Sequence, residues 1–210
     1  MTKTKAQQIM AATEVRAADD VTAAIQDIAA EFEPYIIKQR RHFHKHPELS
    51  LAEERTTSDI ANQLDAMNIP YERPLKTGLV ATLRGTAPDA YREDGTPRRR
   101  ILLRADIDAL PVTEQTGEEF ASVNEGCMHA CGHDAHTSTG LALAHWVADH
   151  KDELKGRFKI LFQPAEEGVR GAAGMAASGI VDDADYFLAA HVAMMCKSGE
   201  VSIRPYGFLC

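Results

Sequence analysis

The stretch CMHACGHDAHTS, residues 127–138, carries two cysteines and three histidines, the thiolate and imidazole groups with which proteins bind zinc. Four of these residues alternate along the chain: Cys127, His129, Cys131 and His133. In an extended chain successive members would lie about 6.6 Å apart, at about 3.3 Å per residue, which is too far for four ligands of one tetrahedral zinc. The cysteines also lack the two-residue separation of disulfide oxidoreductases. We therefore expect two of the four to bind metal, and Cys131 and His133, on either side of Gly132, are the better pair.

Two adjacent glutamates offer a second kind of chemistry. Glu166 and Glu167 lie between Pro164 and Gly168, just after an apolar run. Neighbouring side chains of an extended segment point to opposite sides, so the two carboxylates can have different roles. One can bind metal, while the other takes a proton from metal-activated water and delivers it to a leaving amine. A solvated acidic turn is the more common fate of such a pair, but the flanking proline and glycine favour the functional interpretation.

Helices and strands alternate in the pattern around these residues. Apolar spacing predicts a helix from about Asp20 to His46, with Pro34 as a potential break, and Ser50 with Glu53 resembles a capping box before a second helix. The inner face of that second helix would carry Ile60, Leu64 and Met67. Two more helices are predicted over His136–Asp149 and Ala172–Ala177, and strands over Leu79–Leu83, Ile101–Arg104, Phe158–Phe162, Tyr186–Ala190 and Val201–Ile203. Such alternation indicates an α/β fold with parallel pairing and helices on both faces of the sheet.

The candidate residues follow the predicted strands. Ligand sites of open α/β sheets gather beyond the carboxyl ends of the strands. Asp106 and Asp108 follow one strand, the glutamate pair follows the next, and His191 follows a third. We expect these segments to meet the Cys131–His133 loop at one edge of the sheet. The two aspartates are either surface charges or, as we interpret them between a strand and a proline, groups that orient metal ligands.

The remaining histidines have simpler interpretations. His42, His44 and His46 lie near the end of the first predicted helix, where histidines interact favourably with the helix dipole, and we interpret them in that way. For His191 the ordinary alternative is a histidine packed in the core, and only its position after a strand favours a ligand. The histidines that receive no role as ligands are His129, His136, His145 and His150.

Composition excludes several classes of protein. The chain has 210 residues, 44% hydrophobic and 26% charged, which is enough for one globular core. The net charge is −8 with both signs interspersed, and the basic stripe typical of nucleic-acid binding is missing. No apolar stretch is long enough for a signal peptide or a membrane span. We therefore expect a cytoplasmic protein whose four cysteines are thiols or metal ligands.

Five motifs together resemble one enzyme family: RRHFHKHPELS, LRADIDALP, MHACGHDAHT, FQPAEEG and AAHV, which span Arg40 to His191. The chain resembles the amino-terminal part of the metal-dependent amidohydrolases related to aminoacylases and zinc carboxypeptidases. Within them it is similar to the branch of hippurate hydrolase, indole-acetyl-amino-acid hydrolase and aminobenzoyl-glutamate hydrolase. The resemblance implies a truncated α/β/α sandwich of the zinc-peptidase type, with a mostly parallel sheet. It also implies two divalent metal ions, zinc or manganese, bound by Cys131, His133, Glu167 and His191, with Glu166 as general base and Asp108 as the catalytic acid that supports the metal site.

The resemblance further implies a reaction and an assembly. The reaction is metal-dependent hydrolysis of the amide bond of small N-acyl or N-aroyl amino acids, with no nucleic-acid or membrane partner. An aminobenzoyl-glutamate-like substrate is favoured because Arg170 could bind a carboxylate, although a surface arginine at a helix start is an equal alternative. Relatives are longer and form homodimers or hetero-oligomers. Residues 1–210 are therefore expected to be the amino-terminal part of the catalytic domain, without the dimerisation (lid) domain and the carboxy-terminal part. The alternative is a truncated, non-catalytic metal-binding or interaction module.

Overall fold

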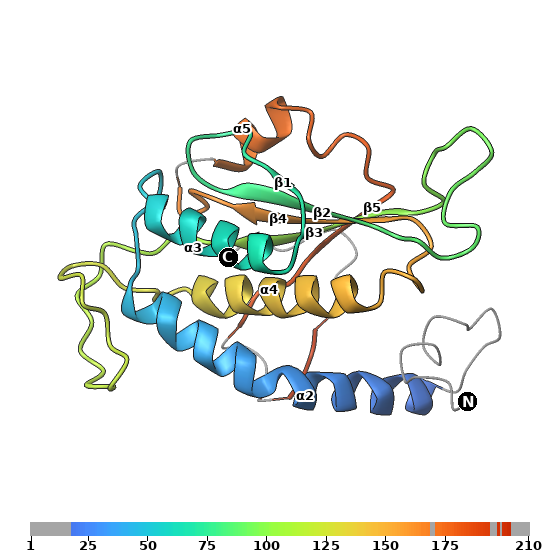
Figure 1. The fold of residues 1–210 in the computed structure, drawn as a ribbon. Helices are drawn as coiled ribbons and strands as arrows, with labels where there is room; N and C mark the ends of the chain where they lie inside the picture. Colours follow the sequence, from blue (N-terminus) through green and yellow to red (C-terminus); the bar gives the residue numbers. More distant parts are fainter. Residues whose placement is uncertain (1–17, 169–170, 194–196, 198, 203–210) are drawn as a thin grey trace.

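The computed structural model describes residues 18–168, 171–193, 197 and 199–202 of the chain. Helices and strands alternate as the sequence predicts (Figure 1). The elements are α2 (Ala18–Lys45), α3 (Glu54–Ala66), β1 (Tyr71–Glu72), β2 (Leu79–Arg84), β3 (Arg100–Asp106), α4 (His133–Asp149), β4 (Arg157–Gln163), α5 (Gly171–Ala177) and β5 (Tyr186–Ala189). Among the described residues no helix is long and apolar enough to span a membrane.

The five strands form one sheet in the order β1-β2-β4-β3-β5. Strand β3 runs parallel to both β4 and β5, whereas β2 pairs antiparallel with β4 and β1 pairs antiparallel with β2. Four strands therefore point the same way, and the predicted mostly parallel α/β sheet is confirmed. Parallel pairing fails at β2 because the loop from residue 85 to residue 99 contains no helix that could carry the chain back across the sheet before β3.

Each face of the sheet has its own apolar core. Leu79, Ala81 and Leu83 of β2 join the larger core under α3 and α4, while Val80 points to the opposite face. This is the period of two expected for a strand that is covered on both sides. On that opposite face Val80, Leu102 and Leu161 pack with Met175 of α5. Figure 1 shows α3 and α4 on one side of the sheet with α2 lying along α4, and α5 on the other side.

Three details of the predicted elements are wrong. Helix α2 runs through Pro34 without a break. Proline has no N–H to donate to the Ala30 carbonyl, but Ala30 is exposed, so water can form that hydrogen bond instead. Helix α4 begins at His133, three residues before the predicted start. No strand forms at Val201 and Ser202, and Ile203 lies outside the described residues.

The sheet ends at an apolar edge. Within the described part of the chain, strand β5 pairs only with β3, and its large side chains are more than half exposed: Tyr186 at 58%, Phe187 at 55% and Leu188 at 52%. An edge strand presents unpaired backbone groups, and soluble proteins usually protect such edges with charge, in particular lysine. Here the described residues pair with one side of β5 alone, and the strand exposes apolar side chains on both faces.

We predict that the chain associates through β5 and that Leu188→Lys lowers this association. A lysine adds charge at the edge without removing a buried side chain. Light scattering across a concentration series measures the effect, and Val123→Lys, which adds the same charge at a 57% exposed loop position, is the matched control. A chain that stays monomeric throughout, or equal association of both variants, would contradict the prediction.

Candidate metal centre

The predicted convergence of segments occurs at the carboxyl ends of β3, β4 and β5. Ligand atoms of Cys131, His133 and Glu167 all lie within 4.8 Å of one another. The Nε2 atom of His191 lies 3.5 Å from the Cys131 Sγ atom. The structure thus brings together the four residues named from the sequence as metal ligands, and their binding of metal remains a prediction.

A glycine turn places Cys131 and His133. Gly132 has φ of 87°, in the left-handed region, and immediately precedes the first residue of α4. A Cβ atom at this position would lie 2.2 Å from the Cγ2 atom of Val192, so only glycine fits. Because the turn is completed at a single residue, the helix begins at once and its first side chain, His133, reaches the centre of the site.

The ring of His133 is fully buried and has one free nitrogen. Its Nδ1 atom lies 2.8 Å from the backbone carbonyl oxygen of Asp108, to which it donates. Its Nε2 atom has no hydrogen-bond partner and lies 3.6 Å from Asp106 Oδ2, 3.8 Å from Glu166 Oε2 and 3.9 Å from Glu167 Oε1. These distances are too long for hydrogen bonds. An Nδ1–H that donates to a carbonyl directs the Nε2 lone pair toward the space between the carboxylates, as in metal-binding histidines.

Unsatisfied buried atoms gather around the same space. Among the described residues, four buried atoms there lack a hydrogen-bond partner: Asp106 Oδ2, Asp108 Oδ1, His133 Nε2 and Glu167 Oε1. Asp106 Oδ2 is compensated in part by an ion pair with Arg104, 2.8 Å away. Buried polar atoms are nearly always hydrogen-bonded, so this accumulation indicates a site for a cation.

The thiol of Cys131 leads to the same conclusion. Burial raises the pKa of Cys131 to about 12, together with a hydrogen bond to Glu167 and the negative charges of Glu167, Glu166 and Asp106. A thiolate in this ring of carboxylates therefore requires a compensating positive charge. A divalent cation would supply that charge, and sulfur, imidazole nitrogen and carboxylate oxygen are a suitable set of donors for it.

Asp108 connects three segments of the site. Its Oδ2 atom accepts hydrogen bonds from the Ser50 hydroxyl, at 2.7 Å, and from the Glu167 backbone N–H, at 3.0 Å. Burial opposes the charge, but the nearby His133 ring and the hydrogen bonds from Ser50 and the Glu167 backbone lower the pKa of Asp108 to about 2. The carboxylate is therefore ionised and fixes the glutamate loop against His133.

The predicted capping box of Ser50 and Glu53 is wrong. Glu53 is fully buried, and its Oε1 atom accepts the backbone N–H of Ala165 at 2.7 Å. The carboxylate of Glu48 caps α3 instead by accepting the N–H groups of Arg55 and Thr56. Ala165 has φ of 52°, unusual for a residue with a side chain, and it immediately precedes the glutamate pair. Both residues that resembled a helix cap therefore hold loops of the site.

His44 lies in the last turn of α2, as the helix-dipole interpretation requires, but it also has partners that the sequence did not show. Its buried ring lies between two carboxylates, with Nδ1 2.7 Å from Asp134 Oδ2 and Nε2 3.1 Å from Glu114 Oε1. Arg40 pairs with the same Asp134 oxygen at 2.8 Å. Asp134 follows His133 in the first turn of α4, so this network fixes the start of that helix. His42, in contrast, pairs with Asp59 at the partly exposed surface.

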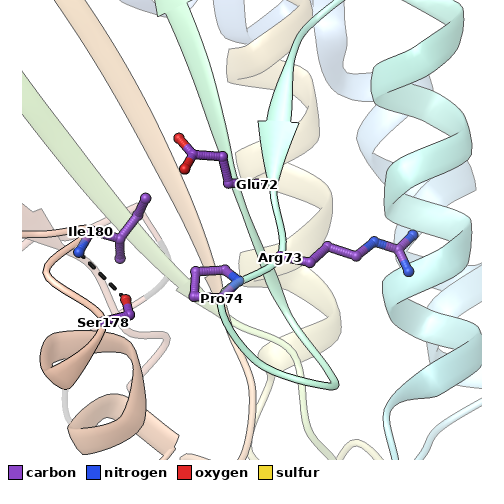
Figure 2. Close-up of a pocket in the computed structure, with 5 residues that line it drawn as sticks. All are labelled: Glu72, Arg73, Pro74, Ser178 and Ile180. Atoms are coloured by element: carbon purple, nitrogen blue, oxygen red, sulfur yellow. Dashed lines mark hydrogen bonds between the residues drawn. The ribbon is translucent and has the colours of Figure 1, made fainter.

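A small pocket lies apart from these groups. It is lined by residues from β1, the loop after it and the turn after α5: Glu72, Arg73, Pro74, Ser178 and Ile180 (Figure 2). None of these side chains belongs to a group whose geometry suits a metal ion. Arg170, predicted to bind a substrate carboxylate, lies outside the described residues.

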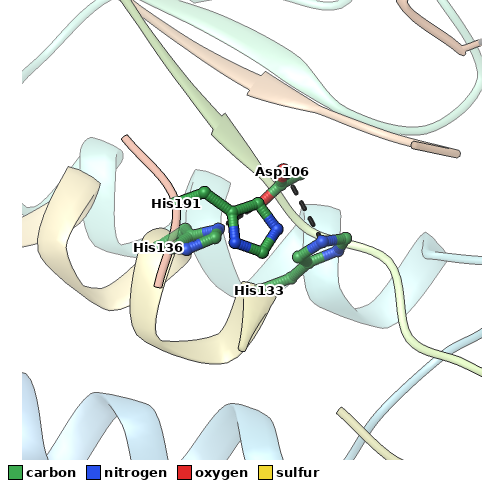
Figure 3. Close-up of side chains that lie close together, drawn as sticks. All are labelled: Asp106, His133, His136 and His191. Carbon is green, nitrogen blue, oxygen red and sulfur yellow. Dashed lines mark hydrogen bonds and ion pairs between the residues drawn. The ribbon is translucent and has the colours of Figure 1, made fainter. Parts of the chain in front are cut away.

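Asp106 and His136 also lie at the site: Asp106 was expected there as a group that orients ligands, whereas His136 was given no role. Together with His133 and His191 they form a second group in which one ligand atom of each residue lies within 4.8 Å of the others (Figure 3). In the sequence, His136 was the predicted first residue of the helix and was assigned no role as a ligand. With α4 starting at His133, the spacing of three residues puts both rings on one helix face, which is the signal that could have identified it.

Comparisons with known proteins agree with these features. Residues 102–206 match the model of Peptidase family M20/M25/M40. A Haemophilus influenzae homolog of one p-aminobenzoyl-glutamate hydrolase subunit is 40% identical over 211 residues, covering 83% of this chain and 50% of the relative. Indole-3-acetyl-aspartic acid hydrolase of Enterobacter agglomerans is 37% identical over 214 residues, covering 84% and 49%. A solved Bacillus subtilis structure, described as a dinuclear metal binding peptidase from the M20 family, has a TM-score of 0.69 and 38% identity, covering 77% of this chain and 44% of that chain. The chain thus spans about half the length of the curated relatives it matches.

We predict that His44→Leu destabilises the chain by about 3 kcal/mol near pH 6, because two buried carboxylates lose their cationic partner. The hydrogen bond to Asp134 raises the pKa of His44, although burial opposes it. This stabilisation is fully present below the ordinary histidine pKa of about 6.5 and is lost as pH rises through the folded-state pKa. The difference in unfolding free energy between parent and variant should therefore shrink from pH 6 to pH 9 in urea titrations.

His42→Leu is the control and should lose about 1 kcal/mol or less. A His44→Leu difference that does not change with pH would contradict a charged His44.

Proposed function

This chain belongs to Peptidase family M20/M25/M40, and we propose that it is the metal-binding part of a hydrolase that cleaves the amide bond of N-acyl or N-aroyl amino acids. The observation that carries the proposal is the approach of a thiol, an imidazole and a carboxylate to within 4.8 Å, amid buried atoms that lack hydrogen-bond partners. Residues 1–210 would be the amino-terminal part of the catalytic domain, in keeping with the half-length coverage of relatives.

The proposed ligands are Cys131, His133, Glu167 and His191, and they would hold two divalent ions. Thiolate and imidazole favour zinc, whereas a carboxylate-rich environment also suits manganese. The Bacillus subtilis structure, described as dinuclear, supports the number of ions. Asp108 would fix the His133 ring through its backbone carbonyl, an outer interaction that orients the ligand.

Glu166 is the proposed general base. Its side chain is 31% exposed, so water and substrate can reach it, and its Oε2 atom lies 3.8 Å from the free His133 nitrogen. Arg104 holds its other oxygen at 3.8 Å. Bound metal would activate water and polarise the substrate carbonyl. Glu166 would take a proton from the attacking water while the water oxygen bonds to the carbonyl carbon. It would then return the proton to the amide nitrogen as the C–N bond breaks.

The proposed substrate carries a carboxylate beside the cleaved amide. The names of two relatives, a p-aminobenzoyl-glutamate hydrolase homolog and an indole-3-acetyl-aspartic acid hydrolase, support an aromatic acyl group on an acidic amino acid. Arg170, three residues after Glu167, is the proposed partner of the substrate carboxylate on the evidence of sequence alone. The complete enzyme would form a homodimer or a hetero-oligomer.

We predict that Glu166→Gln and Glu167→Gln have different effects. Glu167→Gln should lower metal occupancy, measured by mass spectrometry of bound metal, because an amide oxygen is a weaker ligand than a carboxylate. Glu166→Gln should leave occupancy near the parent value and, in a longer parent chain that carries the complete catalytic domain, lower turnover of p-aminobenzoyl-glutamate and hippurate by about 10²–10⁴. Glu119→Gln, which makes the same change at an exposed loop position, is the control.

Each alternative has its own outcome in this experiment. Equal loss of metal in both variants would mean that the roles of the two glutamates are divided wrongly. Full turnover in Glu166→Gln would remove the general-base assignment. Metal binding without any turnover in the parent chain would favour the non-catalytic metal-binding module.

A further inference from the structure

His136 uses both of its ring nitrogens within the protein. The Nδ1 atom lies 2.5 Å from Asp106 Oδ1, and the Nε2 atom lies 2.9 Å from the backbone nitrogen of Val192. The residue is buried, and its ring packs edge-on against the ring of His191, with centroids 4.6 Å apart. The rings of His133, His136 and His191 form a triangle, with the His133 centroid 5.6 Å from that of His136 and 5.8 Å from that of His191 (Figure 3).

The backbone donor fixes the hydrogen on the His136 ring. A backbone N–H can only donate, so the Nε2 atom that faces Val192 must accept and carries no hydrogen. The hydrogen is therefore on Nδ1 and is donated to Asp106. With one lone pair engaged and the other nitrogen protonated, His136 has no free electron pair for a metal ion. Its closeness to the ligand group consequently does not make it a ligand.

Val192 is the point at which the chain after β5 is attached to the site. Its N–H bonds to His136, and its side chain lies against Gly132, where a Cβ atom would come within 2.2 Å of its Cγ2 atom. These contacts join the segment that carries His191 to the turn between Cys131 and His133. Strand β5 itself is exposed along its whole length and gives this segment little burial.

We propose that His136 is a positioning residue, which holds His191 in ligand position by accepting the Val192 N–H while Asp106 fixes the hydrogen on Nδ1. The inference rests on the proposed metal site, since it concerns how one ligand is held. His136 acts through Val192 and touches neither metal nor substrate. Positioning requires a hydrogen-bond acceptor at the place of Nε2, where it can accept the Val192 N–H. A polar group at the place of Nδ1 faces Asp106 and cannot make this bond.

Two amide substitutions separate these features. In His136→Gln the side-chain oxygen can occupy the place of Nε2 and accept the Val192 N–H. The side chain of His136→Asn is one carbon shorter, so it reaches Asp106 and not Val192. We expect cobalt titration of the parent to show two equivalents, with a thiolate-to-cobalt absorption band from Cys131. His191→Ala identifies the cobalt ion that depends on His191, because that equivalent is lost in this variant. In His136→Asn the affinity for the same cobalt ion should fall by about 10–100-fold, while the thiolate band is retained. In His136→Gln the affinity should stay close to that of the parent.

The possible results distinguish this inference from the proposed function. A parent chain that binds no cobalt would overturn both. If the parent and both variants bind two equivalents of cobalt equally well, the role of His136 is overturned and the proposed metal site stands. Loss of both equivalents in the Asn variant, with a lower thermal midpoint of the metal-free protein, would show a general structural role and overturn positioning. Nitrogen NMR of the metal-free parent should show the Nδ1–H form of His136, and the Nε2–H form would contradict the inference.

Discussion

Negative charge is concentrated around one buried imidazole nitrogen, the Nε2 atom of His133. Oxygen atoms of Asp106, Glu166 and Glu167 lie 3.6–3.9 Å from it, at distances that leave space between them. In the unfolded chain each carboxylate is hydrated, so bringing them together out of water is unfavourable without positive charge. Arg104 compensates part of the Asp106 charge and Ser50 donates a hydrogen bond to the neighbouring Asp108, while other buried atoms of these described residues lack hydrogen-bond partners. Binding of a cation there would therefore stabilise the folded chain as well as provide chemistry.

The surrounding fold holds the loops of the site together although their carboxylates repel one another. Parallel strands β3, β4 and β5 end at one edge, and each is followed by a residue of the site. The segment immediately before α3 contributes Glu53 and Ser50, which hold the loops after β4 and β3. Helix α2 contributes His44, which fixes the first turn of α4 through Asp134. Each loop that carries a proposed ligand thus has at least one hydrogen bond to a regular element or to another loop of the site.

The strands and their convergence could be predicted from the sequence because those signals are local. The predicted strand Phe158–Phe162, for example, differs from β4 by only one residue at each end. Polar residues directly after such apolar runs identify the edge of the sheet. What failed has a common cause. Ser50, Glu53 and His44 were given local roles at helix ends, but their partners lie 58, 112 and 90 residues away in the chain. His136 was missed because α4 begins earlier than predicted, directly after the left-handed Gly132, a position where the nearby Val192 side chain leaves no room for a Cβ atom.

Zinc-edge X-ray absorption of the zinc-loaded chain tests most directly whether these loops form one metal centre with the Cys131 thiolate as a ligand. The parent should show a sulfur neighbour at about 2.3 Å together with nitrogen and oxygen neighbours at about 2.0–2.2 Å. Cys131→Ser should lose the sulfur neighbour, and Cys127→Ser, which changes the other free cysteine of the described chain, should keep it. A parent spectrum without sulfur, or a sulfur neighbour that persists in Cys131→Ser, would contradict the proposed centre.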